Sequence, residues 1–227
     1  MTTHDAWEKI HSSRDWGAYP TEYVIRFVAR NYYQTEREKI RILDFGCGQG
    51  AHTWYLAREG FDTYAFDISE SAIEKMKLRL EKEKLFAHVQ VMDGVRLGYP
   101  ESFFDAVIDS ACIYANKVED IQKMHQNIFR VLKPGGKFLS FVFGKGTTGY
   151  GTGTLIEPDT YEYMTEGNLP RIGYAHFFEQ KEILRMYTEV GFKSPTIDLW
   201  TYTDNGNCVE GYILLLKNNL EKRCRKW

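Results

Sequence analysis

A glycine-rich segment directly after an apolar run is the feature of this sequence with the clearest chemical meaning. Residues 42–50 read ILDFGCGQG, with glycines at 46, 48 and 50, and a helical pattern follows. Glycines let the backbone turn sharply and approach a ligand, and the first turn of a helix offers unpaired N–H groups. The segment therefore predicts a site where backbone donors contact a polar ligand.

Three acidic residues follow strand-like runs at positions suited to a nucleoside ligand. Asp67 ends the second apolar run, where a carboxylate can bind both hydroxyls of a ribose. Asp44 precedes the glycines and is placed to hold a cationic amino group. Asp93, with Gly94 after it, follows the third run at a place suited to an adenine amino group. A single acid at a strand end is usually a helix cap or a loop residue. The prediction therefore depends on all three acids occurring together with the glycines at the expected places along the chain.

Two kinds of nucleoside cofactor fit the glycine segment. Gly46-x-Gly48-x-x-Ala51 also matches the dinucleotide fingerprint, which leaves an NAD-dependent oxidoreductase as an alternative. Asp44, Asp93 and a closing antiparallel hairpin favour S-adenosylmethionine. A further alternative is a module that binds the cofactor without catalysis.

Five ordered segments resemble the motifs of class I S-adenosylmethionine-dependent methyltransferases. They are ILDFGCGQG (42–50), AFDIS (65–69), MDG (92–94), FFDAVIDS (103–110) and LKPGGKFLS (132–140), and the resemblance covers residues 40–217. It implies a Rossmann-like doubly wound sheet, with S-adenosylmethionine as methyl donor and S-adenosylhomocysteine as product. The expected cofactor-binding residues are Asp44, Gly46, Cys47, Gly48, Gly50, Asp67, Ile68, Asp93, Gly94, Asp109 and Tyr19.

Candidate catalytic residues follow from the chemistry of methyl transfer. The reaction needs alignment and a dry site, and it needs a base only when the acceptor must lose a proton. Asp109 ends the fourth strand-like run, beside the expected methyl position, and His176 precedes the last helix. Four further residues follow Asp109: Ser110, Cys112, Tyr114 and Asn116. The alternatives are a structural role for His176 and a capping or backbone-anchoring role for Asp109.

Alternating strand and helix patterns must position these residues. Strand-like runs at 40–45, 61–66, 87–92, 103–108 and 137–143 alternate with helical runs at 51–59, about 71–84 and 118–132. Ser71 and Glu74 have capping-box spacing near the start of the second of these helices. The order predicts an α/β fold with an open, mostly parallel sheet and helices on both faces. A last helix (179–190) and two strands (196–202 and 208–217), joined by an Asn-Gly turn, predict an antiparallel hairpin at the end of the sheet.

We expect one methyltransferase domain over residues 1–227, because no linker or repeat divides the chain. It comprises an N-terminal arm and helix (1–39), a cofactor-binding half (40–143), a Gly/Tyr-rich lid insertion (144–178), and a C-terminal helix and hairpin (179–217). Residues 1–19 are expected to be an irregular arm. Its Trp16 and Tyr19 either cover the cofactor or pack the first helix onto the core. The insertion is either a mobile wall of the acceptor pocket, with Tyr150, Tyr161, Tyr163 and Tyr174 facing it, or a disordered surface loop.

Composition excludes several classes of function. The 227 residues carry 29 Lys+Arg and 31 Asp+Glu, and this balance argues against a general nucleic-acid-binding protein. No apolar stretch is long enough to cross a bilayer and the N-terminus lacks the apolar core of a secretory signal, so we expect a cytoplasmic protein without a membrane partner. Cys47, Cys112, Cys208 and Cys224 have no metal-ligand or redox spacing. We therefore expect reduced thiols, most of them buried, and no metal.

The predicted function is methyl transfer from S-adenosylmethionine to a hydroxyl, or with less support an amine, of a small polar metabolite. The near-neutral charge and the many aromatic residues favour a small-molecule acceptor. The segment WGAYP (16–20), together with the glycine segment and the Gly-rich insertion, is also similar to methyltransferases of surface-polysaccharide and modified-sugar pathways. That similarity implies O-methylation of a sugar or a nucleotide-sugar. The sequence leaves the oligomeric state open.

Overall fold

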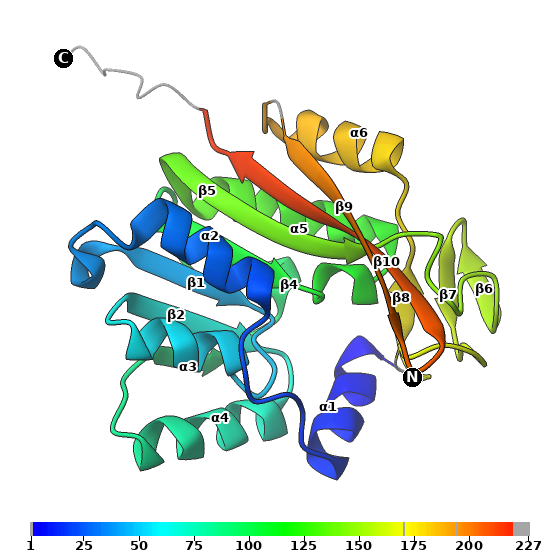
Figure 1. Cartoon of the computed structure of the whole chain (residues 1–227), viewed down its shortest axis with the longest axis horizontal. Coiled ribbons are helices and arrows are strands. Elements are labelled where there is room, and N and C mark those ends of the chain that lie inside the picture. Colours follow the sequence, from blue (N-terminus) through cyan, green and yellow to red (C-terminus); the bar gives the residue numbers. More distant parts are fainter. Residues whose placement is uncertain (1, 170, 194, 220–227) are drawn as a thin grey trace.

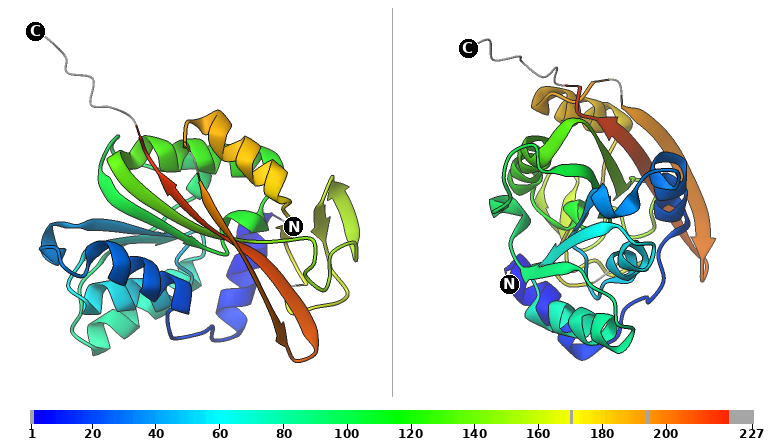
Figure 2. Two further views of the ribbon diagram at one scale, coloured as in Figure 1. Left: turned by 45° about the horizontal axis from the view of Figure 1, so that its top comes forward. Right: turned by 90° about the vertical axis from the view of Figure 1, so that its left-hand side faces the viewer.

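A computed structural model describes residues 2–169, 171–193 and 195–219. A seven-stranded sheet in the order β3-β2-β1-β4-β5-β10-β9 runs through the molecule, with helices on both faces (Figures 1 and 2). Its strands are β1 (Arg41–Phe45), β2 (Asp62–Asp67), β3 (His88–Val91), β4 (Phe104–Ser110), β5 (Leu132–Phe143), β9 (Thr196–Asp204) and β10 (Asn207–Lys217). The α-helices are α1 (Thr3–Ser13), α2 (Glu22–Tyr32), α3 (Ala51–Arg58), α4 (Glu70–Lys82), α5 (Val118–Val131) and α6 (Gln180–Val190).

The pairing of the strands confirms the predicted α/β fold. β1 pairs in parallel with β2 and β4, and parallel pairing continues outward to β3 and β5. β10 pairs antiparallel with both β5 and β9. The central strands are continuous apolar runs because both of their faces are covered. One boundary differs clearly from the prediction: the strand expected at 137–143 begins at Leu132. The segment Lys133-Pro134-Gly135-Gly136 therefore belongs to the start of β5, directly after α5.

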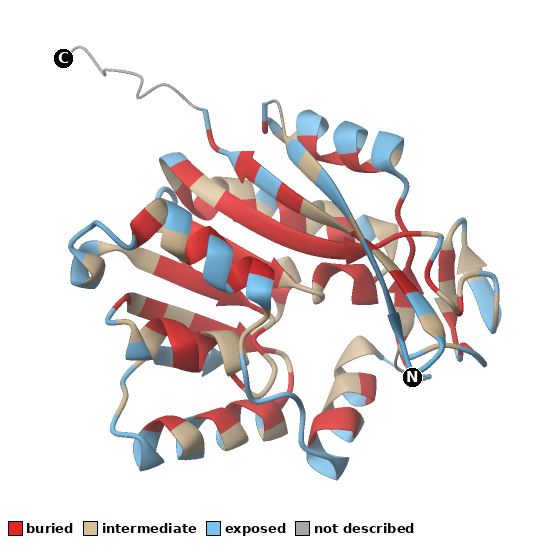
Figure 3. Ribbon diagram, in the orientation of Figure 1, coloured by how far each residue is buried: buried red, intermediate tan, exposed pale blue. Residues whose placement is uncertain are grey.

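Aromatic contacts show which helices cover which face. Tyr23 of α2 stacks on Phe141 of β5 with ring centroids 5.3 Å apart, whereas Tyr187 of α6 lies 6.0 Å from Phe138. Residues 138 and 141 point to opposite faces of the strand, so α2 and α6 cover opposite faces. Figure 3 shows the result, with buried central strands between helices and an exposed outer strand β9. Each large apolar side chain fully buried in these layers contributes about 1.5–3 kcal/mol.

The N-terminal segment is a helix, and the expectation of an irregular arm was wrong for residues 3–13. A capping box begins α1: the Asp5 N–H donates to Thr2 Oγ1, and the Thr2 N–H donates to Asp5 Oδ2, both at 3.1 Å. Further along α1, Glu8 accepts hydrogen bonds from the Ser69 hydroxyl (2.6 Å) and the Ser71 N–H (3.2 Å). Ser69 is the N-cap of α4, so the predicted start at Ser71 was two residues late. These bonds hold α1 beyond the carboxyl ends of the parallel strands (Figure 1).

The Gly/Tyr-rich insertion contains a second, three-stranded antiparallel sheet. It is formed by β6 (Thr154–Glu157), β7 (Thr160–Glu162) and β8 (Tyr174–His176). Tyr150 packs edge-on against Tyr161 and donates its hydroxyl hydrogen to Asp159 (2.7 Å). The insertion therefore has a small core of its own. From the sequence we expected either a mobile wall or a disordered loop here, and this sheet was not predicted. Short 3-10 helices lie at Arg37–Lys39, Gly94–Arg96 and Ile113–Ala115.

Candidate active site

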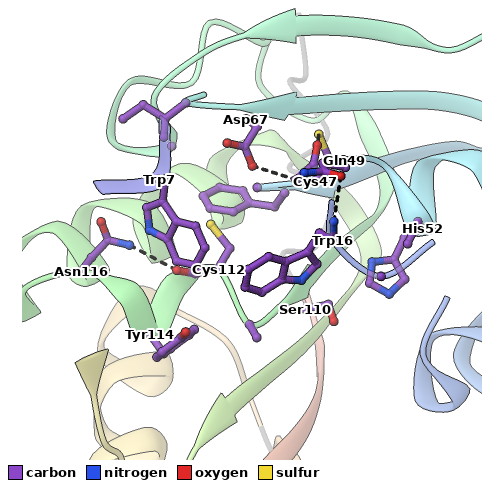
Figure 4. A pocket seen from close by; sticks show the side chains of 18 of the residues that line it. Trp7, Trp16, Cys47, Gln49, His52, Asp67, Ser110, Cys112, Tyr114 and Asn116 are labelled. Carbon is purple, nitrogen blue, oxygen red and sulfur yellow. Dashed lines mark hydrogen bonds between the residues drawn. The ribbon is translucent and has the colours of Figure 1, made fainter. Parts of the chain in front are cut away.

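A cavity of about 470 Å³ lies at the carboxyl ends of the parallel strands. The last residues of four strands line it: Phe45 of β1, Asp67 of β2, Ser110 of β4 and Phe143 of β5. In open α/β sheets this edge is where ligands bind. Figure 4 shows the side chains of α1, the glycine loop and the segment after β4 around one common space.

The glycine loop forms one wall of the cavity with its backbone. Gly46 has a φ of 65° and Gly50 a φ of 84°, both in the left-handed region that favours glycine. A Cβ at Gly46 would collide with the Cys112 side chain, and one at Gly50 would lie 2.5 Å from Met76. Gly46 and Gly48 line the cavity, whereas Gly50 does not and instead caps the N-terminus of α3.

Asp67 braces this loop from the end of β2. Its Oδ2 accepts the Gly48 N–H at 2.8 Å, and its Oδ1 accepts the Ser69 N–H at 3.0 Å. Burial raises the pKa of the Asp67 carboxyl, and the N–H donors act in the opposite direction. Ile68 lines the cavity beside it. The position at the cavity wall is compatible with the predicted ribose contact.

The remaining predicted cofactor residues divide into two groups. Cys47, Asp93, Gly94 and Tyr19 line the cavity, and Asp93 caps the 3-10 helix that follows it by accepting the Val95 N–H (2.9 Å). Asp44 does not line it: the carboxylate is buried behind the loop and accepts the Thr53 hydroxyl at 2.6 Å. Burial raises the pKa of Asp44 to about 7.

Helix α1 closes the cavity opposite the sheet. Thr3, Trp7 and His11, spaced by four residues, face the cavity from one side of the helix. Trp7 and Trp16 meet edge-on with centroids 6.1 Å apart, and His11 lies against both rings. Gln49 of the glycine loop holds this group in place, because its Oε1 accepts the backbone N–H of Trp16 at 2.9 Å. The aromatic cover is thus fastened to the loop that it faces (Figure 4).

The segment after β4 crosses the floor of the cavity, and Asp109 anchors it from below. Asp109 is fully buried and accepts the N–H groups of Cys112 (2.9 Å) and Ile113 (3.2 Å) on one oxygen and the Ser140 hydroxyl (2.6 Å) on the other. Burial raises the pKa of Asp109 to about 6. Asp109 does not line the cavity, whereas Ser110, Ala111, Cys112, Tyr114 and Asn116 do. The geometry therefore fits the backbone-anchoring alternative, and neither the predicted cofactor contact nor the predicted base role of Asp109 is visible.

His176 lies outside the cavity, in the core of the insertion. It is fully buried, with Nδ1 2.8 Å from the Thr160 hydroxyl and Nε2 3.3 Å from the Glu182 carboxylate. The insertion contributes Asn168 and Leu169 to the cavity, and its four tyrosines named above do not line it. The predicted base role of His176 and the predicted tyrosine wall therefore find no support in the positions of these residues.

Several lining residues were not predicted as site residues. They are Trp7 and His11 of α1, Gln49 and His52 near the glycine loop, Tyr23 of α2, Asn168 of the insertion, and Tyr202 and Asp204 of β9. The Thr2-x-x-Asp5 capping pattern, with Trp7 and His11 one turn apart, was the available signal for α1. The side chains on β9 had no comparable signal.

Charges and thiols in the described residues restrict the chemistry further. The formally charged residues that line the cavity are Asp67, Asp93, Asp120 and Asp204, with no Lys or Arg among the described lining residues. No cluster of three or more potential metal ligands occurs in the described part of the chain.

Cys47 is buried, Cys112 partly buried and Cys208 exposed, all three as free thiols, so the expectation that most cysteines are buried was wrong for this set. Cys224 lies outside the described residues. Within those residues, no helix has the length and apolarity to span a membrane.

Comparisons with known proteins show which proteins the chain is similar to. A family model described as "Methyltransferase domain" matches residues 42–136. A ubiquinone biosynthesis O-methyltransferase of Rickettsia canadensis is 27% identical over 76% of this chain and 70% of its own length. A demethylmenaquinone methyltransferase of Leptospira interrogans is 31% identical over 61% of this chain, which spans 57% of that relative.

A solved structure extends the similarity over most of the fold. The crystal structure of a SAM-dependent methyltransferase of Methanosarcina mazei superposes with a TM-score of 0.69, at 25% identity, over 86% of this chain and 98% of the other. The match includes the mostly parallel sheet with its antiparallel C-terminal strands. S-adenosylmethionine is accordingly the cofactor, rather than NAD. The chain is thus an S-adenosylmethionine-dependent methyltransferase, and its fold is that of the class I enzymes.

Proposed function

We propose that the enzyme transfers its methyl group to a small, planar, uncharged acceptor whose nucleophile is a phenol-type hydroxyl. The aromatic part of the cavity supports a planar acceptor. Trp7, Trp16, Tyr23, Tyr114, Phe143 and Tyr202 surround the space beyond the glycine loop. Aromatic walls of this kind bind flat rings through large contact areas and stacking.

One observation carries the choice of nucleophile. Each of the two histidines that line the cavity already accepts a hydrogen bond on its unprotonated ring nitrogen, so neither is available as a general base. His11 Nδ1 lies 3.3 Å from Gln49 Nε2, which can only donate, and His52 Nε2 accepts the Thr21 N–H at 3.3 Å. Burial also lowers the pKa of His11, and that of His52 to about 4. An acceptor hydroxyl that ionises near pH 10, as a phenol does, needs far less assistance than an aliphatic hydroxyl.

The relatives are consistent with such an acceptor. The two named above are called a ubiquinone biosynthesis O-methyltransferase and a demethylmenaquinone methyltransferase. Their names refer to quinones, whose rings are flat and uncharged. We therefore take a hydroquinone or a related phenol as the first acceptor to test.

The sugar acceptor expected from the sequence is the second candidate. Aromatic walls with hydroxyl and amide groups also suit a sugar ring, and the described lining provides both. The nucleotide-sugar form has less support, because no Lys or Arg among the described lining residues is present to bind its phosphates.

The test is transfer of labelled methyl from S-adenosylmethionine to three matched panels: phenols and hydroquinones, free sugars, and nucleotide-sugars. We expect turnover with the first panel. Trp7→Phe should raise the KM for the phenol about fivefold, since an aromatic pair contributes about 0.5–1.5 kcal/mol. Trp54→Phe is the control, because Trp54 does not line the cavity and contacts it through Tyr19. Turnover confined to sugars would replace the proposal with the second candidate.

A further inference from the structure

The loop after β4 contains a mostly buried tyrosine whose hydroxyl has no partner within the described part of the protein. Tyr114 is 3% exposed and lines the cavity, yet its hydroxyl has no hydrogen-bond partner among the described residues. The other buried tyrosines nearby differ: Tyr23 lies 2.5 Å from the Ser110 hydroxyl, and Tyr187 donates to Ser140. A hydroxyl that has no protein partner and lies at a cavity wall is free to bond a ligand or a water molecule there.

A second polar atom stands two residues further along the same loop. Asn116 is 6% exposed and also lines the cavity. Its Nδ2 donates to the carbonyl oxygens of Cys112 and Ile113, both at 3.3 Å, which fixes the amide and leaves Oδ1 without a partner among the described residues. The loop thus offers a hydroxyl that can donate and an amide oxygen that accepts.

The loop holds these two groups in place before any ligand arrives. Asp109 binds the N–H groups of Cys112 and Ile113, and Ala111 adopts a left-handed φ of 61° that turns the chain toward the cavity. The Tyr114 ring packs edge-on against Phe143 with centroids 4.7 Å apart. A side chain fixed in this way loses little conformational freedom on binding, so its hydrogen bond contributes directly to affinity.

From these contacts we infer that Tyr114 and Asn116 form the subsite that positions the acceptor through a hydroxyl group on its ring. A hydroxyl can accept a hydrogen bond from Tyr114 and donate one to Asn116, which a carbonyl, an ether or a bare ring cannot do. The inference rests on the proposed planar acceptor. It makes Tyr114 a specificity-determining residue, because a site built to bond a hydroxyl rejects an analogue that lacks it.

The experiment compares two probes that differ by one hydroxyl, 1-naphthol and naphthalene, bound to the full chain saturated with S-adenosylhomocysteine. Equilibrium dialysis gives the ratio of the two dissociation constants. Wild-type protein should prefer 1-naphthol, and Tyr114→Phe should reduce that preference about threefold to tenfold, the effect of one lost hydrogen bond, while leaving naphthalene binding unchanged. Asn116→Ala should reduce the same ratio.

Tyr32→Phe is the matched control, because the Tyr32 hydroxyl donates to the Asp105 carbonyl oxygen and does not line the cavity. It should leave the ratio as in wild type. Equal affinity of the wild-type protein for the two probes, or an unchanged ratio in both Tyr114→Phe and Asn116→Ala, would overturn the inference while the proposed planar acceptor stands. Failure of both rings to bind wild-type protein would overturn the proposed function and this inference with it.

Discussion

The two halves of the cavity are built in different ways. In the cofactor half, the wall is made of the glycine loop and of carboxylates held by short local bonds, such as Gly48 N–H to Asp67 at 2.8 Å. In the acceptor half, the walls are side chains from α1, α2, the loop after β4, the insertion and β9. The first half is built by neighbouring strands and the loops that follow them, whereas the second half needs elements from the whole fold.

Polar groups make the same contrast. Asp67, in the cofactor half, has both carboxylate oxygens occupied by donors in this structure. The hydroxyl of Tyr114 and the Oδ1 of Asn116, on the acceptor side, have no partner among the described residues. We infer that the cofactor half is organised in advance of binding, and that the acceptor half keeps its donors and acceptors for the substrate.

The largest expected effect concerns the buried acid behind the glycine loop. Burial raises the pKa of Asp44 to about 7, against about 3.9 in an unfolded chain. The folded state therefore retains a proton that the unfolded state loses. The contribution of Asp44 to stability is full below about pH 4 and is lost as the pH rises to about 7, by about 4 kcal/mol.

Chemical denaturation of wild type and Asp44→Asn between pH 4 and pH 8 measures this pH-dependent contribution to the free energy of unfolding. The free energy of unfolding should fall with pH more steeply in wild type than in Asp44→Asn over that range. Asp62→Asn, at the more exposed start of β2 beside Arg41, is the control and should follow wild type. Parallel curves for wild type and Asp44→Asn would contradict a raised pKa of Asp44 in the folded protein.

The next effect tests whether Asp67 organises the cofactor half. Asp67→Ala removes the acceptor of the Gly48 and Ser69 N–H groups and the carboxylate at the cavity wall. Hydrogen bonds to a charged group contribute about 1.5–3 kcal/mol, so the Kd for S-adenosylhomocysteine should rise about tenfold to a hundredfold. Titration calorimetry measures it, with Asp62→Ala as control. An unchanged Kd would remove the distinction between the two halves.

Most of the residues predicted to bind the cofactor line the cavity, because the determinants of this half are local. The glycines, Asp67 and Asp93 lie at the ends of successive strands, and parallel strands bring their carboxyl ends to one edge. The absence of Asp44 from the cavity lining has a geometric cause: a residue type at the end of a strand does not say whether its side chain faces the cavity or the helix behind the loop. Here it faces Thr53 of α3.

The acceptor half could not be predicted in the same way. Asp109 and Ser110 are neighbours on β4, and successive side chains on a strand point to opposite faces, so a one-residue difference decides which one reaches the cavity. Trp7, Asn168 and Tyr202 come together only when α1, the insertion and the hairpin are in place. Because these residues are far apart in the sequence, no local pattern could predict that they meet at one cavity.

The smallest expected effect on catalysis is that of His176, and it tests whether the insertion takes any part in proton transfer. His176→Ala removes the bonds to Thr160 and Glu182 in a fully buried site, which should lower stability by about 1–3 kcal/mol. Because the imidazole does not line the cavity, kcat of the folded enzyme should stay within about twofold of wild type. Thermal melting and steady-state kinetics below the melting range separate the two effects. A large fall in kcat at unchanged stability would mean that the insertion rearranges during turnover to bring His176 to the acceptor, and the acceptor half would then be incomplete as it stands.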